Sequence, residues 1–267
     1  MIAATSVRDA LDSAVIALTA AGCDTPRLDA EVLLAHALGI SRAELLADSR
    51  RELTGPQTRV FMDYARRRRE REPVAYIVGS KGFRFIELAV DRRVLIPRPE
   101  TEFVVEAALG LPHGARVVDV GTGSGAIALA LKHERPDLVV AATDISAEAL
   151  DVARANAARL GLDVRFVHGD LLAGLEADAV VSNPPYVAAG DRVMPEVARY
   201  EPPVALFADD GLTVIRRLVR LPVRFLALEH GEGQADAIEA LARAAGFDDV
   251  QRVRDLAGIE RVAVARR

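Results

Sequence analysis

The 267-residue chain has no tryptophan, one cysteine, four tyrosines and eight phenylalanines. With so few aromatic rings, a broad stacking platform for single-stranded nucleic acid is not expected. The single Cys23 excludes an internal disulfide and a metal site built from several cysteines. No apolar run approaches the roughly 20 residues of a transmembrane helix, and the N-terminal segment contains acidic residues without a signal-peptide pattern. We therefore expect a soluble cytoplasmic protein with no membrane association.

Charge and composition narrow the class further. The formal net charge of −5, with a pI of about 5.6, disfavours a dedicated DNA- or RNA-binding protein. Hydrophobic residues make up 51% of the chain, which suits one large domain or two modest ones with a sizeable core. The five histidines show no metal-ligand spacing, so we expect no metal site.

Residues 1–75 are predicted to form a compact helical bundle. Short amphipathic stretches alternate there with helix start signals. Two of these signals are capping boxes, in which Ser41 precedes Glu44 and Thr54 precedes Gln57 by three residues. Short helices with tight connections and Leu/Ala cores are typical of a bundle.

The bundle is expected to close with the arginine-rich run 66–72, which has two interpretations. It is either a solvated helix end whose cations suit the helix dipole, or a docking patch for a nucleic-acid-bound partner. The segment that follows, 76–98, alternates apolar residues such as Phe83 and Phe85, and is predicted to be a β-hairpin linker.

From residue 99 to residue 267, short Val-rich strands alternate with helices. The strands expected to be buried and parallel are 116–120, 138–143, 164–168, 177–182 and 223–229. The last two strands, 250–254 and 261–265, have no room for a helix between them and should form an antiparallel hairpin. The prediction is an α/β fold: a doubly wound, mostly parallel seven-stranded sheet preceded by a small all-α N-terminal domain.

The tetrapeptide Asn183-Pro184-Pro185-Tyr186 follows the fourth strand. An Asn at a strand exit, held by two prolines and followed by an aromatic ring, suits the binding of a planar NH2 group. Proline fixes φ and lacks an N–H, so the turn is stiff and its carbonyls are free for a ligand. A plain Asn-Pro turn is the alternative. The chain has only two asparagines, at 156 and 183, so this tetrapeptide is not expected to arise by chance.

A glycine-rich turn, Gly121-Thr122-Gly123-Ser124-Gly125, joins the first strand to a helix. Its glycines allow a tight turn and close approach of a ligand to the helix N-terminus. Asp144 ends the next strand, where a carboxylate can accept hydrogen bonds from both hydroxyls of a ribose. The G-x-G-x-G spacing disfavours a nicotinamide dinucleotide. Asp119, two residues before the first glycine, can orient the loop or meet a cationic ligand end.

Asp170 and Leu171 follow the third strand. Asp170 can accept a hydrogen bond from an adenine amino group while Leu171 packs on the ring; an Asp that caps a strand-to-helix turn is the alternative. Together with the glycine turn, Asp144 and Asn183, these residues follow the carboxyl ends of four successive strands. Ligands of open α/β sheets bind at that edge.

These residues resemble the class I S-adenosylmethionine-dependent methyltransferases, in particular the members that methylate planar amide or exocyclic nitrogens. Four further stretches, together with the helical N-terminal region, resemble the bacterial peptide chain release factor N5-glutamine methyltransferases: 95–102, 201–206, 210–212 and 229–231. The resemblance spans nearly the entire chain. One stretch departs from it, because Phe207-Ala208-Asp209 stands where the family usually has paired glycines, which leaves the local loop conformation open.

The resemblance implies an enzyme that methylates the glutamine side-chain amide in the Gly-Gly-Gln loop of peptide chain release factors. The donor would be S-adenosylmethionine and the product S-adenosylhomocysteine. Asn183, Pro184 and Tyr186 would act in catalysis: the Asn183 oxygen and the Pro184 carbonyl would accept the two amide N–H groups, and Tyr186 would flank the amide plane. Pro185 would complete this substrate site. The glycine turn, Asp144, Asp170, Leu171 and Asn183 would hold the cofactor.

The family also places its Arg-Pro-x-Thr-Glu segment near substrate and cofactor, which implies that Arg98, Glu100 and Thr101 line the pocket. An extended domain-linking strand is the alternative, since Pro97 and Pro99 both favour that conformation. The N-terminal bundle is a candidate substrate-recognition domain, and a monomer is expected.

Two other functions remain open. A nucleic-acid amino-methyltransferase would grip an exocyclic NH2 by the same geometry after flipping the base out; the acidic balance and the lack of a base-reading domain argue against it. A non-catalytic scaffold that binds an adenosyl cofactor or NAD would have no need of the complete tetrapeptide.

Overall fold

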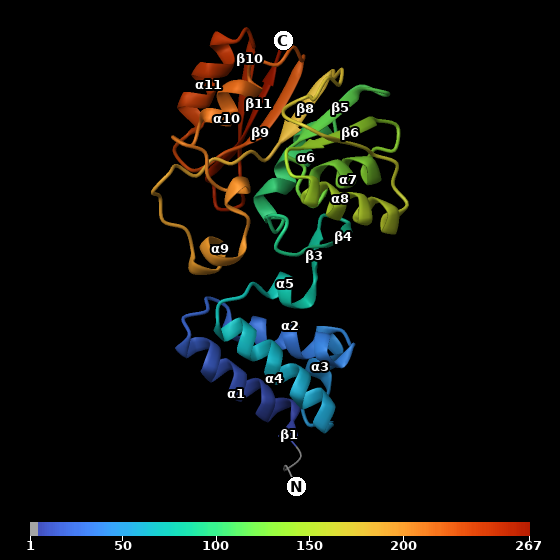
Figure 1. Cartoon of the computed structure of the whole chain (residues 1–267), viewed down its shortest axis with the longest axis vertical. Coiled ribbons are helices and arrows are strands. Elements are labelled where there is room, and N and C mark those ends of the chain that lie inside the picture. The colour runs from blue at the N-terminus through green and yellow to red at the C-terminus, as the bar shows by residue number, and fades with distance from the viewer. Residues whose placement is uncertain (1–4) are drawn as a thin grey trace. The chain divides into compact units, whose positions relative to one another are not determined.

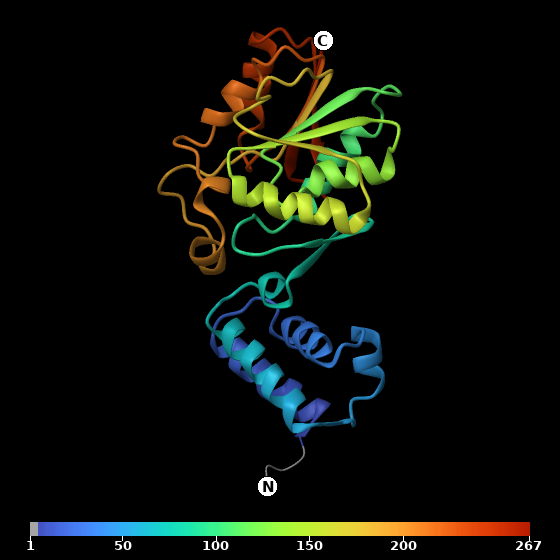
Figure 2. The same ribbon diagram turned by 45° about the vertical axis from the view of Figure 1, so that its right-hand side comes forward.

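The computed structural model describes residues 5–267, which fall into two units (Figures 1 and 2). The helical unit consists of the described residues up to Gly79 together with Val193–Tyr200. The sheet unit consists of Ser80–Arg192 and Glu201–Arg267. The chain therefore returns to the helical unit once, late in the sequence, and no helix signal near residue 193 predicted this return.

The helical unit forms where the capping signals indicate. Its helices are α1 (Val7–Ala20), α2 (Pro26–Leu38), α3 (Arg42–Ala47), α4 (Gly55–Arg69), α5 (Val74–Val78) and α9 (Pro195–Tyr200), and the short strands β1 (Thr5–Ser6) and β2 (Glu52–Leu53) pair antiparallel. Both predicted capping boxes are present at the starts of α3 and α4. Leu11, Leu18, Leu33, Leu34 and Phe61 belong to the buried core of this unit.

Arg68 in the arginine-rich run is buried, although either interpretation of that run required it to be exposed. Its Nε donates to Asp29 Oδ2 at 2.7 Å, and it also pairs with Glu196 of α9. Arg71 donates to the same Glu196 carboxylate. A buried guanidinium needs such carboxylate partners, since an unpaired charge away from water is costly. Part of the run therefore fixes α9 to the bundle.

The sheet unit contains the predicted seven-stranded sheet. Its strands are β5 (Arg116–Val120), β6 (Val139–Asp144), β7 (Arg165–His168), β8 (Ala179–Ser182), β9 (Phe225–Glu229), β10 (Asp249–Arg254) and β11 (Glu260–Arg266). They lie in the order β10-β11-β9-β8-β5-β6-β7. The first five pair parallel with one another, and β11 pairs antiparallel with both β9 and β10. The predicted parallel sheet with a terminal antiparallel hairpin is confirmed.

Helices cover both faces of this sheet (Figure 1). They are α6 (Glu102–Ala108), preceded by the 3-10 turn Pro99–Thr101, then α7 (Ala126–Glu134), α8 (Ala147–Leu160), α10 (Thr213–Leu218) and α11 (Ala235–Ala244). Apolar residues of α10 and α11 pack with Val118, Val180 and Leu226 in one buried cluster. The helices α6, α7 and α8 lie on the opposite side. No helix between Thr5 and Arg267 is long and apolar enough to cross a membrane.

The predicted hairpin is formed by β3 (Ser80–Phe83) and β4 (Ile86–Ala89) within the sheet unit. Asn156 of α8 fixes its end: Ala89 N donates to Asn156 Oδ1 at 2.7 Å, and Asn156 Nδ2 donates to Ala89 O at 3.0 Å. The same Nδ2 donates to Ser124 O at 2.9 Å. One of the two asparagines of the chain thus joins the hairpin to the glycine turn.

Candidate active site

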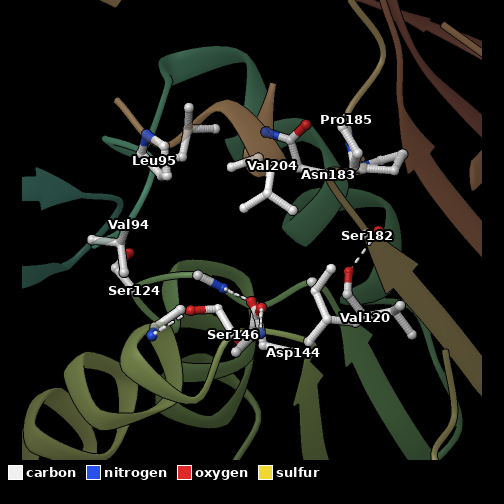
Figure 3. A pocket seen from close by; sticks show the side chains of 18 of the residues that line it. Val94, Leu95, Val120, Ser124, Asp144, Ser146, Ser182, Asn183, Pro185 and Val204 are labelled. Carbon is white, nitrogen blue, oxygen red and sulfur yellow. Dashed lines mark hydrogen bonds between the residues drawn. The ribbon is translucent and has the colours of Figure 1, made fainter. Parts of the chain in front are cut away.

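A pocket of the sheet unit opens at the carboxyl ends of β5 to β8 (Figure 3). Eleven of the predicted site residues line it: Thr101, Gly121, Thr122, Gly123, Ser124, Asp144, Asp170, Leu171, Asn183, Pro184 and Pro185. Four others lie outside this lining: Arg98, Glu100, Gly125 and Tyr186. The strand ends therefore bring most of the predicted residues to one cavity, as parallel topology requires.

The three glycines of the turn meet two different structural requirements. Gly121 and Gly123 have φ of 73° and 56°, a region that side-chain-bearing residues rarely adopt. Gly125 has φ of 87°, and a Cβ there would stand 2.8 Å from Leu129 Cδ1 and 3.4 Å from Ala153 Cβ. The first two glycines leave the pocket wall open, whereas the third allows the turn to pack closely against α7 and α8.

Asp119 orients this turn from below. It is fully buried, and its Oδ2 accepts from Thr122 Oγ1 at 2.6 Å and from Ala128 N at 3.1 Å. Burial raises the pKa of the Asp119 carboxyl to about 7. Of the two roles considered for Asp119, its hydrogen bonds serve the first, the orientation of the loop.

Asp144 forms the floor of the pocket. Its Oδ2 accepts from Gly123 N and its Oδ1 accepts from Ser146 N, both at 2.9 Å. Each carboxylate oxygen has a second lone pair, so the side chain is fixed while it can still accept from a ligand. Figure 3 shows Asp144 beside Ser146 and across the cavity from Asn183.

Asp170 and Leu171 form the wall after β7. Asp170 pairs with Arg217 of α10, a pocket residue that sequence reasoning did not predict. Leu171 has a positive φ of 50°, and its carbonyl oxygen accepts from Thr143 Oγ1 at 2.6 Å. This hydrogen bond holds Leu171 in a backbone conformation that a bulky residue rarely adopts.

The tetrapeptide is held at both ends. Asn183 Nδ2 donates to Thr101 Oγ1 at 3.1 Å. Tyr186 O accepts from Gln234 Nε2 at 3.0 Å, and the Tyr186 hydroxyl donates to Glu229 Oε1 at 3.0 Å. Burial, together with the neighbouring Glu229, raises the pKa of Tyr186, so its hydroxyl stays a neutral donor.

Comparison with known proteins agrees with this geometry. A protein-family model described as the PrmC N-terminal domain matches residues 9–79, and one described as the methyltransferase small domain matches residues 100–199. A release factor glutamine methyltransferase from Caulobacter vibrioides is 44% identical over 91% of this chain and 90% of that protein. One from Deinococcus radiodurans is 43% identical over 98% of each.

The chain belongs to the release factor glutamine methyltransferase family. Among solved structures, a methyltransferase from Pyrococcus furiosus matches with a TM-score of 0.51 and 18% identity, covering 67% of this chain and 87% of that one. At that identity the likeness concerns the fold alone, and it agrees with the doubly wound sheet described above.

Two stretches that carry the family resemblance lie against the tetrapeptide. A Cβ at Gly211, which has φ of 77°, would stand 2.7 Å from Tyr186 O and 2.8 Å from Gln234 Nε2. A Cβ at Gly231 would stand 3.3 Å from Tyr186 Cδ2. Both glycines of these family stretches therefore make room for the loop that contains Tyr186.

The departure from the family pattern, Phe207-Ala208-Asp209, forms a regular β-bridge without glycine. Ala208 N donates to Val187 O at 3.0 Å, and Asp209 O accepts from Ala189 N at 2.8 Å. None of Phe207, Ala208 and Asp209 has a positive φ. The loop after the tetrapeptide is therefore paired in this chain with residues that need no special backbone freedom.

Glu201 is a buried residue beside the pocket lining, and sequence reasoning gave it no role. One oxygen, Oε2, accepts from Ile96 N at 3.1 Å, and the other pairs with Arg98. It joins two stretches of wall whose members were also not predicted individually: Arg93, Val94, Leu95, Pro97, Pro202, Val204 and Ala205. The family resemblance of 95–102 and 201–206 was the signal that pointed to most of this wall, and Arg93 and Val94 lie outside it.

The structure offers no candidate metal centre within residues 5–267, where no group of three or more His, Cys, Asp or Glu side chains could hold an ion. His230 is fully buried, and its Nδ1 lies 2.9 Å from Gly231 O. Burial lowers the pKa of His230, which favours the neutral imidazole.

Proposed function

We propose that this protein methylates the side-chain amide nitrogen of the glutamine in the Gly-Gly-Gln loop of peptide chain release factors, with S-adenosylmethionine as donor. The observation that carries the proposal is the Asn183 side chain at the pocket wall. Its nitrogen is held by Thr101 at 3.1 Å, which leaves its oxygen for a planar NH2 group. Curated relatives with the name release factor glutamine methyltransferase support this choice of substrate.

The residues present fit the cofactor. Asp144 is fixed by two backbone N–H groups and keeps lone pairs for the two ribose hydroxyls. Gly121 and Gly123 leave room beside it, since a Cβ at either would meet no atom within 4 Å. Asp170 and Leu171 would hold the adenine. When bound, S-adenosylmethionine supplies an electrophilic methyl group on a sulfonium.

The chain's own contribution is to orient a weak nucleophile. The lone pair of an amide nitrogen is delocalised into its carbonyl. Hydrogen bonds from the two substrate N–H groups to Asn183 Oδ1 and the Pro184 carbonyl raise the electron density on that nitrogen and fix its direction. Tyr186 flanks the amide plane. Alignment of the amide nitrogen with the methyl group supplies most of the acceleration, and the proton released from nitrogen passes to water.

Methyl-labelled S-adenosylmethionine tests the proposal when it is offered with a release factor, unmodified DNA and ribosomal RNA in parallel. We expect label in the release factor and none in a release factor whose loop glutamine is replaced by alanine. Label in nucleic acid alone would contradict the proposal in favour of a nucleic-acid amino-methyltransferase. Cofactor binding without transfer to any substrate would favour a scaffold.

Asn183→Ala should remove transfer, because the substrate amide loses the group that orients it. We expect kcat to fall at least about 100-fold, while the cofactor Kd measured by calorimetry changes less than about fivefold, since Asp144 and the glycine turn remain. A variant that retains full activity would show that Asn183 does not hold the substrate.

We further propose that the protein acts as a cytoplasmic monomer and that its helical unit recognises the release factor.

A further inference from the structure

A buried carboxylate lies behind the tetrapeptide. Glu229 ends β9 and is 1% exposed. Its Oε2 accepts from Thr101 Oγ1 at 2.6 Å, and its Oε1 accepts from the Tyr186 hydroxyl at 3.0 Å. A buried carboxylate that accepts two hydrogen bonds, one of them short, constrains both donors. Glu229 does not line the pocket, so it acts on any substrate only through these donors.

Thr101 passes this constraint on to Asn183. A threonine hydroxyl has one hydrogen, and here that hydrogen is directed at Glu229. The Thr101 oxygen can then only accept from its other neighbour, 3.1 Å away, which must be the Asn183 NH2 group rather than the Asn183 oxygen. Because an amide side chain can turn either end toward a partner, such a neighbour decides which end is presented elsewhere.

We propose that Glu229 is a positioning residue, which acts through Thr101 to hold the Asn183 amide with its oxygen toward the substrate. The inference rests on the proposed function. A reversed Asn183 would present an NH2 group to the substrate NH2 group, which places donor against donor. The orientation of this single amide therefore separates a productive site from an unproductive one, although every residue of the tetrapeptide is unchanged.

The same carboxylate also fixes the other end of the tetrapeptide through Tyr186. The Tyr186 hydroxyl is bound to Glu229, while Gly231 and Gly211 leave just enough room for its ring and its backbone carbonyl. Glu229 thus holds Asn183 and Tyr186 together from one point on the sheet. This explains why the turn needs a partner on β9 as well as its two prolines.

Protonation of Glu229 would release the constraint. Burial raises the pKa of Glu229 to about 7; Thr101, Tyr186 and Arg261 act against burial, and Glu100 acts with it. A proton on Oε2 would turn toward Thr101, whose own hydrogen would then be free to meet the Asn183 oxygen. We expect kcat to fall as the pH drops through about 7, because either orientation of Asn183 then becomes acceptable.

Matched valine substitutions test the relay through Thr101. Thr101→Val removes the hydroxyl but keeps the shape, and kcat at saturating cofactor should fall roughly tenfold. Thr101→Ser should recover most of this loss. Thr25→Val is the control: it removes a hydroxyl outside the pocket lining that likewise donates to a carboxylate, Asp29 Oδ1, at 2.8 Å, and should change kcat less than about twofold. Equal effects of Thr101→Val and Thr25→Val would overturn the proposal.

The two asparagines of the chain allow a test that does not depend on activity. In protein labelled with ¹⁵N on the asparagine side-chain amides, Asn183 and Asn156 give two NH2 signals. Thr101→Val should shift the Asn183 signal and speed its hydrogen exchange. The Asn156 signal should stay in place, because that amide is held by Ala89 and Ser124. An Asn183 signal that does not respond to Thr101→Val overturns the relay.

A pH titration of the same spectra isolates Glu229. We expect the Asn183 signal to titrate with a midpoint of about 7 in the unmodified protein and not to titrate in Glu229→Gln. An unchanged titration in that variant overturns the role of Glu229. If no release factor is methylated, the proposed function fails, but these spectra still show whether Glu229 sets the orientation of Asn183.

Discussion

Asp119 is a fully buried carboxylate whose second oxygen, Oδ1, has no hydrogen-bond partner among the described residues. Its first oxygen holds the Thr122 hydroxyl and the Ala128 amide, and so joins the glycine turn to α7. Asp119, which orients the glycine turn, is therefore an ionisable group held away from water. Such a group links folding to pH.

Stability of the ligand-free protein should fall as the pH rises from about 4 to about 7. The folded pKa of Asp119 is raised from 3.8 to about 7, so in this window the folded protein keeps a proton that the unfolded chain has lost. Glu229, raised from 4.5 to about 7, acts in the same direction. Asp119→Asn should flatten the decline in the free energy of unfolding by an amount on the order of a few kcal/mol. Urea unfolding between pH 5 and pH 7.5 measures it, and an unaltered slope would contradict this account.

Individual site residues differ in how far the sequence could predict them. Asp144 and Asn183 could be placed because Asp144 ends a strand and Asn183 follows one, and parallel strands bring such positions together. The link from Glu229 through Thr101 could not, because it joins a 3-10 turn to the end of β9 across more than a hundred residues. Hydrogen bonds of that kind depend on packing and leave no periodic pattern in the sequence.

At the scale of elements, the turn at Gly211 is a point of close approach. Alanine there would combine a strained φ of 77° with a Cβ 2.7 Å from Tyr186 O. Gly211→Ala should lower kcat strongly and reduce the free energy of unfolding by about 1–3 kcal/mol, since the Tyr186 loop must move. Gly190→Ala is the matched control, because Gly190 has φ of 96° but no atom within 4 Å of its Cβ. Equal losses of kcat in the two variants would count against the steric explanation.

Helix α9 is too short to be stable by its own backbone hydrogen bonds, and ion pairs attach it to the bundle. It has six residues, and Glu196 binds both Arg68 and Arg71. Glu196→Ala should cost up to about 3–5 kcal/mol locally, because Arg71 loses its carboxylate partner and Arg68 keeps only Asp29. Trypsin should then cut faster at Arg192 and Arg199. Arg66→Ala, which removes an exposed cation of α4, should change the cleavage rate little. Equal rates in the two variants would refute the anchoring role.

Regular elements were predictable where local signals define both ends. Helix α8 is an example: it starts at the Ser146 cap and stops at Gly161 in a left-handed conformation. Helix α9 gave no such signal, because its stabilising partners on α4 and beyond lie more than a hundred residues earlier. Local rules find elements that are stable through their own sequence, and α9 is stable through distant charges.

For the whole molecule, the topology of the sheet could be predicted from the sequence, whereas the division into two units could not. The alternation of strands and helices and the final hairpin are both visible in the sequence, and both agree with the observed sheet. The return of Val193–Tyr200 to the helical unit is not visible in the sequence. A unit assembled from two separate stretches of chain cannot be recognised from a composition change at a single boundary.

This discontinuity sets an order of events during synthesis. The first 79 residues are translated well before Glu196. Arg68 and Arg71 therefore lack this partner until about a hundred further residues have been added to the chain. The strand β8 and the tetrapeptide also emerge before residue 200. The helical unit can thus be completed only after the central part of the sheet has been translated. Its final assembly is therefore a late step in co-translational folding.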